Sequence, residues 1–236
     1  KTKKFPIKLF DFGNEIRVVK TSKEYKSILG KKLKSINDIP IDEVYAKVSE
    51  LTPFTENKQS SMDRTCQYLI ISELLVALNF TNESGKASFV FIDDNNKEEQ
   101  IILNSYSKEK LDNFEYSCIN FSKPNIVAPK ETKHKNLWFA AKNNSKTIYI
   151  KFGEYPSEKE VNTFSESVYN YIEKHQSNGL IIDLRNNYGG DFFMGLILTS
   201  WLNASDFISW KSNVYVLVDR VTYSAAMVNA VQFKQL

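Results

Sequence analysis

The chain has 236 residues, a length that suits one or two domains and allows a sizeable hydrophobic core. Hydrophobic residues make up 42% of it and charged residues 25%, proportions that exclude disordered, collagenous and low-complexity proteins. The 31 basic and 28 acidic residues are spread along the chain and give a net charge of only +3, so we expect no nucleic-acid partner.

The first half of the chain predicts a small α+β unit. Residues 32–36 are expected to form a short strand, and apolar residues at helical spacing follow from Ile41 to Leu51. A second helix is predicted over residues 68–78. Residues 88–103 predict a β-hairpin that turns at residues 94–96, because two strand-like runs flank an Asp-Asn-Asn sequence.

An interruption of the apolar pattern over residues 123–136 predicts a linker. Pro124, Pro129 and a run of polar residues interrupt the apolar periodicity there. We therefore expect a first domain over residues 1–122 and a second domain over residues 137–236.

The sequence of the second domain predicts three strands, each followed by a helix, which is the pattern of an α/β fold. The expected strands are residues 147–152, 180–184 and 214–218, and the expected helices begin near Ser157, Gly190 and Ser224. The last two strands are nearly continuous apolar runs, as in strands that are buried on both faces of a parallel sheet. This repetition implies right-handed crossovers and a ligand site at the carboxyl ends of the strands.

The first candidate site is the sequence DLRNNYGGD, residues 183–191. Four of the eight glycines of the chain lie between residues 179 and 195. A glycine pair between a strand and a helix allows positive φ and lets a backbone N–H approach a ligand closely, and such N–H groups favour negative charge. The alternative is an ordinary tight turn in which Asp183 and Arg185 form a structural salt bridge, which is more common. The segment lacks the spacing of a phosphate-binding loop.

The second candidate site is VLVDRVTYSAAM, residues 216–227. Ser224 follows a buried strand and begins a helix of small residues, which is the geometry of an exposed nucleophile at a sharp turn. The positive end of the helix dipole would stabilise an oxyanion beside it. The alternative is a serine that merely caps the helix, the commoner role for serine at this position. The segment does not match the GxSxG signature.

Together, DLRNNYGG and VLVDRVTYSAAM, about 30 residues apart, resemble the core of the S41 peptidases. This family comprises the C-terminal processing or tail-specific proteases and their tricorn-core relatives, serine endopeptidases with a crotonase/ClpP-like α/β domain. The resemblance extends to residues 137–139 and 147–152. It also includes GKKLKSINDIP, residues 30–40, which is similar to the G-x-x-L-x-x-I-N-G-x-P stretch of a PDZ-like domain. The sequence around Ser224 resembles a less studied branch with a T-[FY]-S-[SA]-A-M pattern.

The resemblance implies a role for each matching residue. Ser224 corresponds to the nucleophile, and the oxyanion hole would be formed by the N–H of Ala225 with that of the Gly189-Gly190 turn. This agrees with the chemistry of acyl transfer, which needs a nucleophile on one side and hydrogen-bond donors on the other. Asp183 and Arg185 are expected to be scaffold. No cofactor is implied, and the expected partner is a peptide or protein substrate.

The sequence departs from the family pattern at the general base. Processing proteases of this family have a lysine about two dozen residues after the serine, whereas this chain ends at Leu236, so we expect it to be truncated. Lys234 is ten residues along the same helix, about 15 Å from Ser224, and is not a substitute. Met227 stands where many members carry a glutamate. The base is therefore left unassigned.

The two histidines are not expected to serve as that base. His134 lies in the predicted linker, and His175 lies near the end of a helix, where the dipole favours a solvated cation. Nothing in their spacing directs either of them toward Ser224.

The remaining features argue against metal and membrane functions. Cys66 and Cys118 form neither a CxxC pair nor a disulfide framework, and two histidines are too few for a multi-histidine centre. We expect no metal ion. The longest uncharged stretch, residues 192–205, is shorter than the roughly 20 residues that cross a bilayer, so no membrane-spanning segment is expected.

The leading hypothesis is a serine endopeptidase that acts through an acyl-enzyme on Ser224, with a PDZ-like module that positions the peptide. Family resemblance implies that it is secreted or lies in the cell envelope. The main alternative is a non-catalytic peptide-binding protein that keeps the fold without a working base. A third hypothesis is a crotonase-type acyl-CoA enzyme, since that fold uses similar backbone donors, although the serine turn argues against it.

Overall fold

The structure is a computed structural model. It describes residues 2–53, 55–82, 85–119, 126, 128–130, 132–142, 144 and 146–236. The chain divides into two compact units, Lys1–Ser122 and Lys123–Leu236, each with its own hydrophobic core. The architecture is mixed α/β with two sheets, which confirms the predicted class at this level.

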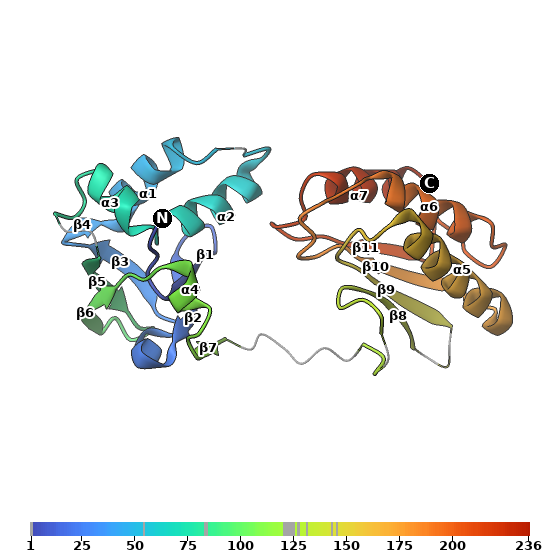
Figure 1. Cartoon of the computed structure of the whole chain (residues 1–236), viewed down its shortest axis with the longest axis horizontal. Coiled ribbons are helices and arrows are strands. Elements are labelled where there is room, and N and C mark those ends of the chain that lie inside the picture. The colour runs from blue at the N-terminus through green and yellow to red at the C-terminus, as the bar shows by residue number, and fades with distance from the viewer. Residues whose placement is uncertain are drawn as a thin grey trace. The chain divides into compact units, whose positions relative to one another are not determined.

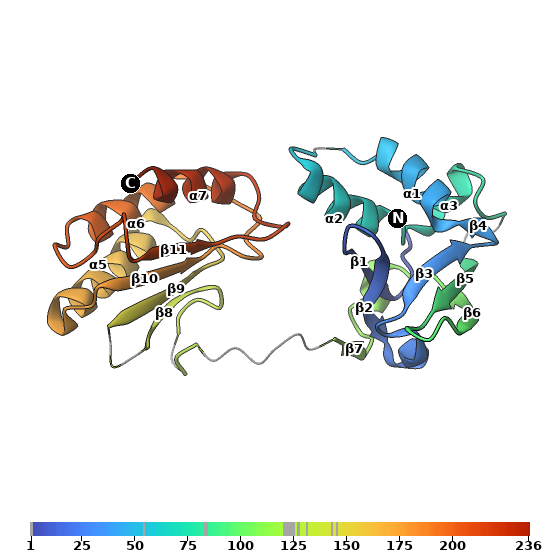
Figure 2. The same cartoon turned by 180° about the vertical axis from the view of Figure 1, so that it is seen from behind.

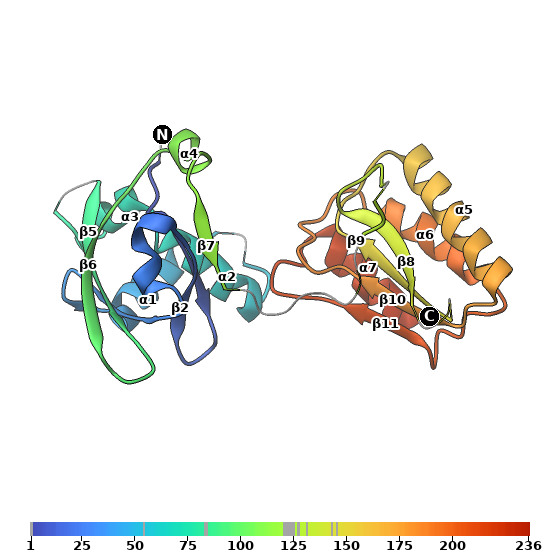
Figure 3. The same cartoon turned by 90° about the horizontal axis from the view of Figure 1, so that it is seen from below.

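The first unit is built on an antiparallel sheet with the strand order β1-β2-β3-β5-β6, in which β4 pairs with β3 and β7 pairs with β2. The strands are β1 (Ile7–Asp11), β2 (Ile16–Ser22), β3 (Lys32–Ile36), β4 (Ile39–Pro40), β5 (Lys86–Ile92), β6 (Glu98–Asn104) and β7 (Tyr116–Cys118). The predicted hairpin is present as β5 and β6, which Figure 3 shows as a long ribbon.

Helices cover the first sheet. They are α1 (Ile41–Glu50), α2 (Lys58–Tyr68), α3 (Ser72–Ala77) and the short α4 (Lys108–Leu111), with a 3-10 helix η1 (Lys23–Ile28). Ile41, Val44 and Val48 of the predicted apolar stripe are buried in a core that includes Leu33 of β3 and Phe89 of β5, whereas Leu51 lies after α1 and is exposed. Asn37 and Asp38, between β3 and β4, both have positive φ. A type I′ turn requires this conformation, which explains why the segment is similar to a motif with Asn-Gly there.

The helix predicted over residues 68–78 is present only over Ser72–Ala77, as α3, and the helix α2 before it was not predicted. The chain forms two helices, α2 and α3, because the residues between them pair with the N-terminal segment. The N–H of Phe5 donates to the carbonyl of Ile70, and the N–H of Ser72 donates to that of Lys3. These backbone groups are therefore not available to continue one helix.

The second unit has a four-stranded sheet with the order β11-β10-β9-β8. Its strands are β8 (Leu137–Lys142), β9 (Thr147–Phe152), β10 (Gly179–Asp183) and β11 (Val214–Leu217), and its helices are α5 (Glu158–His175), α6 (Phe193–Asn203) and α7 (Ala225–Gln235). β9, β10 and β11 are parallel, whereas β8 is antiparallel to β9. The three helices lie on one face of the sheet (Figures 1 and 2). Right-handed crossovers between successive neighbouring strands require this of α5 and α6, which connect β9 to β10 and β10 to β11.

Local sequence explains the bounds of these elements. The predicted capping box joins Ser157 and Glu160 at the start of α5, and Gln176 ends the helix in the left-handed conformation. β10 and the following Leu184 are largely buried, as predicted. β11 was predicted to be buried on both faces, and this is wrong, because the Tyr215 side chain is 62% exposed. β11 lies at the end of the strand order, where only β10 pairs with it among the described strands.

The segment predicted as a linker, residues 123–136, falls within the second unit. Residues 123–125, 127 and 131 of it lie outside the described residues. Its described end contacts the unit: His134 Nδ1 lies 3.1 Å from Glu154 Oε1, and Lys133 Nζ lies 2.6 Å from Glu160 Oε1.

Candidate active site

Three loops meet where the parallel strands of the second unit end. Residues 153–157 follow β9, residues 184–192 follow β10, and residues 218–224 follow β11. Because the carboxyl ends of parallel strands lie at one edge of a sheet, these loops are neighbours. Both candidate segments from the sequence therefore lie at the same edge.

Ser224 has a strained backbone. Its φ is 52° and its ψ is −126°, a combination that costs a residue with a side chain about 1–3 kcal/mol. It occupies the N-cap position of α7, but its side chain makes no capping hydrogen bond, and the residue is exposed. The capping alternative therefore does not account for this serine. An exposed hydroxyl on a strained strand-to-helix turn is the arrangement that a nucleophile elbow has.

Gly189 packs directly against this turn. A Cβ atom at Gly189 would lie 2.7 Å from Ser224 Cβ, 2.7 Å from the Tyr223 carbonyl oxygen and 3.1 Å from the Ala225 nitrogen. Gly189 also has a φ of 90°, which favours glycine. The structure thus brings the predicted Gly189 and Ser224 together, and a side chain at Gly189 would separate them.

The backbone N–H groups of the two segments have different partners. The Gly189 N–H donates to Asn187 Oδ1 at 2.9 Å. In contrast, neither the Gly190 N–H nor the Ala225 N–H donates to another of the described residues. Sequence reasoning named both glycines as oxyanion donors. The geometry favours Gly190 and Ala225 for that role and gives Gly189 the task of close packing.

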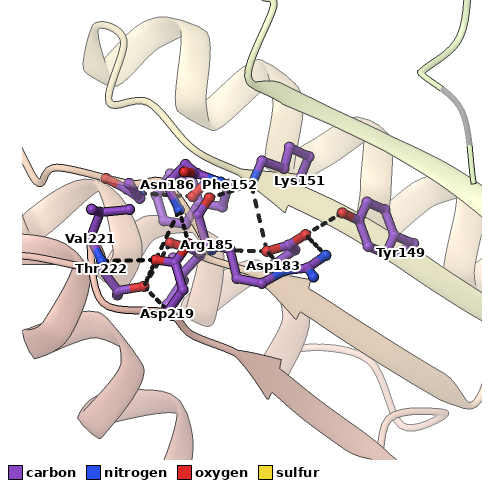
Figure 4. A network of polar contacts seen from close by, with 11 residues as sticks. Tyr149, Lys151, Phe152, Asp183, Arg185, Asn186, Asp219, Val221 and Thr222 are labelled. Carbon is purple, nitrogen blue, oxygen red and sulfur yellow. Dashed lines mark hydrogen bonds and ion pairs between the residues drawn. The ribbon is translucent and has the colours of Figure 1, made fainter. Parts of the chain in front are cut away.

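Asp219 connects the two loops that carry these groups (Figure 4). Its carboxylate accepts the Asn186 N–H at 3.0 and 3.1 Å and the Val221 N–H at 3.1 Å. Thr222 Oγ1 donates to the Leu184 carbonyl at 3.0 Å. The Asn186–Asp219 and Thr222–Leu184 contacts cross between the loop after β10 and the loop after β11 and fix their spacing, whereas the Val221 contact holds the second loop in shape.

Asn187 connects this scaffold to the end of β9. It is fully buried, its Nδ2 donates to the Phe152 carbonyl at 2.7 Å, and its own carbonyl accepts the Tyr223 N–H at 2.9 Å. Sequence reasoning did not single out Asn187, Asp219 or Thr222. Their only signal was a polar residue in a loop that follows a strand, which is too common to identify a scaffold.

Asp183 and Arg185 form the structural salt bridge that the sequence suggested. Arg185 Nη2 lies 2.7 Å from Asp183 Oδ2, and the Tyr149 hydroxyl donates to the same oxygen at 2.5 Å. Asp183 is only 2% exposed, and Lys151 Nζ lies 3.5 Å from its other oxygen (Figure 4). Burial opposes ionisation of Asp183, but the hydrogen bonds from Arg185 and Tyr149 outweigh it and lower its pKa to about 2.

We expect this depressed pKa to make the second unit sensitive to acid. The folded pKa lies below the ordinary value of 3.8, so the ionised form contributes stability above pH 3.8 that is lost as the pH falls toward 2. The expected contribution is about 2 kcal/mol. Urea unfolding of the wild type and of Asp183→Asn, measured between pH 6 and pH 2, checks this. The two free energies of unfolding should converge at low pH, and a constant difference between them contradicts the assignment.

The histidines do not complete the site. His134 is paired with Glu154, and His175 stacks on Tyr171 with ring centroids 4.2 Å apart. Neither forms a hydrogen bond with Ser224 in the described part of the chain. A cavity of about 570 Å³ lies beside α5, β8, Pro129 and residues 132–134, and none of the predicted site residues lines it.

Across the described residues, no group of three or more His, Cys, Asp and Glu side chains is placed to hold a metal ion. Within the same residues, no helix combines the length and the apolar character that a membrane span needs.

Comparisons with known proteins find similarity in structure only. No protein-family model matches the chain, and no curated protein matches its sequence. Mature CPAF matches with a TM-score of 0.50 and 12% identity, over 83% of this chain and 43% of that one. The structure of CPAF complexed with lactacystin gives a TM-score of 0.49 and 11% identity, over 84% and 44% of the two chains. The chain thus spans less than half the length of CPAF.

Two further structures match over more of the chain but less closely. The photosystem II D1 C-terminal processing protease has a TM-score of 0.33 and 14% identity, over 99% of this chain and 58% of that one. A protein from Bacteroides fragilis described as an S41 protease has a TM-score of 0.29 and 11% identity, over 98% and 60%. Structures named as a C-terminal processing protease and an S41 protease are thus among the matches, in line with the predicted resemblance, and at 11–14% identity the likeness concerns the fold alone.

Proposed function

We propose that this chain carries the nucleophile and oxyanion hole of an S41-type serine endopeptidase with a crotonase/ClpP-like core. The observation that carries the proposal is the strained, exposed Ser224, whose hydroxyl makes no capping bond and whose turn packs against Gly189. Backbone strain of this kind persists where the surrounding structure holds it, and such sites are concentrated at active centres.

The reaction has two steps. Ser224 Oγ attacks the carbonyl carbon of a peptide bond, the C–N bond breaks, and the amine leaves with a proton, so that an ester forms on Ser224. Water then hydrolyses the ester, releases the new carboxyl group and restores the hydroxyl. The Gly190 and Ala225 N–H groups stabilise the oxyanion of each tetrahedral intermediate. The group that accepts the Ser224 proton is not among the residues assigned here.

The two alternatives from the sequence predict different behaviour. A non-catalytic peptide-binding protein would keep the fold but has no need of a strained serine. A crotonase-type acyl-CoA enzyme would also use paired backbone N–H groups, but the Ser224 hydroxyl stands beside them and favours acyl transfer to the protein itself. The strain at Ser224 therefore favours the peptidase.

Incubation of the full-length protein with unfolded proteins tests the proposed function. Mass spectrometry of the products should show new peptide termini that are absent with Ser224→Ala. If peptides bind but are never cleaved, the peptide-binding alternative replaces the peptidase. If acyl-CoA thioesters are consumed and peptides are not, the acyl-CoA alternative does.

The S41 resemblance also implies that the protein works outside the cytoplasm, and we propose this location for it.

We further propose that the first unit is PDZ-like and binds an extended peptide as an added strand at an edge of its sheet. Support comes from the type I′ turn at Asn37 and Asp38 within the PDZ-like sequence motif. Removing residues 1–122 should weaken binding of a fluorescent unfolded peptide to the Ser224→Ala protein at least tenfold. Unchanged affinity contradicts a peptide-binding role for this unit.

A further inference from the structure

A tyrosine from a third loop lies against the proposed oxyanion donor. A Cβ atom at Gly190 would lie 2.7–2.8 Å from Tyr155 Cβ, Cγ and Cδ2. Tyr155 follows β9, whereas Gly190 follows β10, so the contact joins neighbouring strand ends. The near part of the Tyr155 side chain therefore limits where the Gly190 backbone can lie.

The hydroxyl of the same tyrosine reaches the helix behind Ser224. It donates to Asn229 Oδ1 at 2.7 Å. Asn229 lies on α7, five residues after Ser224, and is fully buried. Burial raises the pKa of Tyr155 above its ordinary value, so the hydroxyl remains protonated and able to donate at neutral pH.

Asn229 also holds the far end of the glycine turn. Its Nδ2 donates to the Phe192 carbonyl at 2.9 Å and to Gln232 Oε1 at 2.7 Å. Phe192 is two residues after Gly190 and precedes α6. Gly195 of α6 permits the approach, since a Cβ there would lie 2.2 Å from Asn229. Tyr155 and Asn229 thus contact Gly190, the segment after it and the helix of Ala225.

We propose that Tyr155 and Asn229 are positioning residues that set the Gly190 N–H at a fixed distance from the Ala225 N–H. The inference rests on the proposed function, because it assigns these two N–H groups to one oxyanion hole. Oxyanion donors act by being in place before charge develops, so a small displacement of one donor lowers the rate more than it lowers binding.

Tyr155→Phe tests this with the least disturbance, because the ring that touches Gly190 remains and only the bond to Asn229 is lost. The probe is a fluorophosphonate, which phosphonylates an active serine with loss of fluoride and places an oxygen in the oxyanion hole. On the full-length protein, we expect the maximal rate of phosphonylation to fall about tenfold, as partial loss of one donor, with the half-saturating probe concentration nearly unchanged.

Ser205→Ala is the matched control. This change also removes one buried hydroxyl, which donates to Glu173 Oε1 at 2.6 Å. Ser205 lies just after the carboxyl end of α6, whereas Gly190 precedes its amino end. Its thermal unfolding midpoint should fall as much as that of Tyr155→Phe, but its phosphonylation rate should match the wild type. A purely structural role for Tyr155 predicts equal rates for the two variants, and that result overturns the inference.

A double-mutant cycle adds a second criterion. Asn229→Ala should slow phosphonylation at least as much as Tyr155→Phe, and the double variant should be no slower than Asn229→Ala alone, because both changes break one coupled contact. Additive losses contradict a shared role. If the wild type is not phosphonylated at Ser224, the proposed function fails and this inference with it. If the wild type is phosphonylated at Ser224 and Tyr155→Phe reacts at the same rate, this inference fails and the proposed function stands.

Discussion

Replacing Ser224 with alanine is expected to abolish peptide hydrolysis by the full-length protein and to leave its thermal unfolding midpoint nearly unchanged. Activity is lost because the variant lacks the hydroxyl that attacks the peptide carbonyl. Stability is kept because the Ser224 side chain makes no capping hydrogen bond, so the usual loss of about 1 kcal/mol for a capping serine does not apply.

Ser224→Gly separates strain from chemistry. Glycine adopts a φ of 52° without the steric cost of a side chain, so this variant should be equally inactive but more stable than Ser224→Ala, by about 1 kcal/mol after the entropy of glycine is counted. Ser200→Ala, at an exposed serine of α6, is the control and should keep full activity. Full activity in Ser224→Ala, or a glycine variant less stable than the alanine variant, contradicts the account of this turn.

Gly190→Ala is expected to lower turnover about 10² to 10³-fold, the effect of losing one oxyanion donor. The methyl group would lie 2.7–2.8 Å from Tyr155 atoms close to that residue's own backbone, which cannot swing away as a side-chain end can. The glycine turn must therefore shift. Because φ at Gly190 is not positive, conformational strain does not explain the loss.

Gly179→Ala is the control for this prediction. Gly179 is the first residue of β10 and so lies at the amino ends of the parallel strands, away from the candidate site. A Cβ atom there would lie 3.0 Å from Thr147 Oγ1. Both variants should lose stability in urea unfolding, but only Gly190→Ala should lose turnover at substrate saturation. Equal turnover in the two variants would remove Gly190 from the oxyanion hole.

The sequence predicted those parts of the fold that depend on local pattern. The capping box at Ser157 and the apolar run of β10 place α5 and β10 correctly, because burial and capping are local properties, whereas β8 was not predicted as a strand. The break between α2 and α3 was not predictable, since it depends on backbone pairing of Ile70 and Ser72 with residues near the N-terminus. The exposure of β11 depends on its position in the sheet, which its apolar sequence does not reveal.

The candidate site, like the fold, could be predicted from the sequence only in part. The sequence placed Ser224 and the glycine pair at two strand ends, and parallel topology alone brings such ends together. It could not predict that Asn187 takes the Gly189 N–H, because this is a side-chain contact within a loop. Tyr155 and Asn229 were missed because a tyrosine after a strand and an asparagine within a helix are ordinary residues until the fold places them together.

The most direct test of the account is to identify the residue that a fluorophosphonate modifies in the native full-length protein. Tryptic digestion and mass spectrometry locate the phosphonyl group, and heat-unfolded protein serves as the control for non-specific reaction. The account predicts a single phosphonylated residue, Ser224, in the native protein and none after unfolding. Modification of another serine, or labelling that persists unchanged in Ser224→Ala, would contradict it.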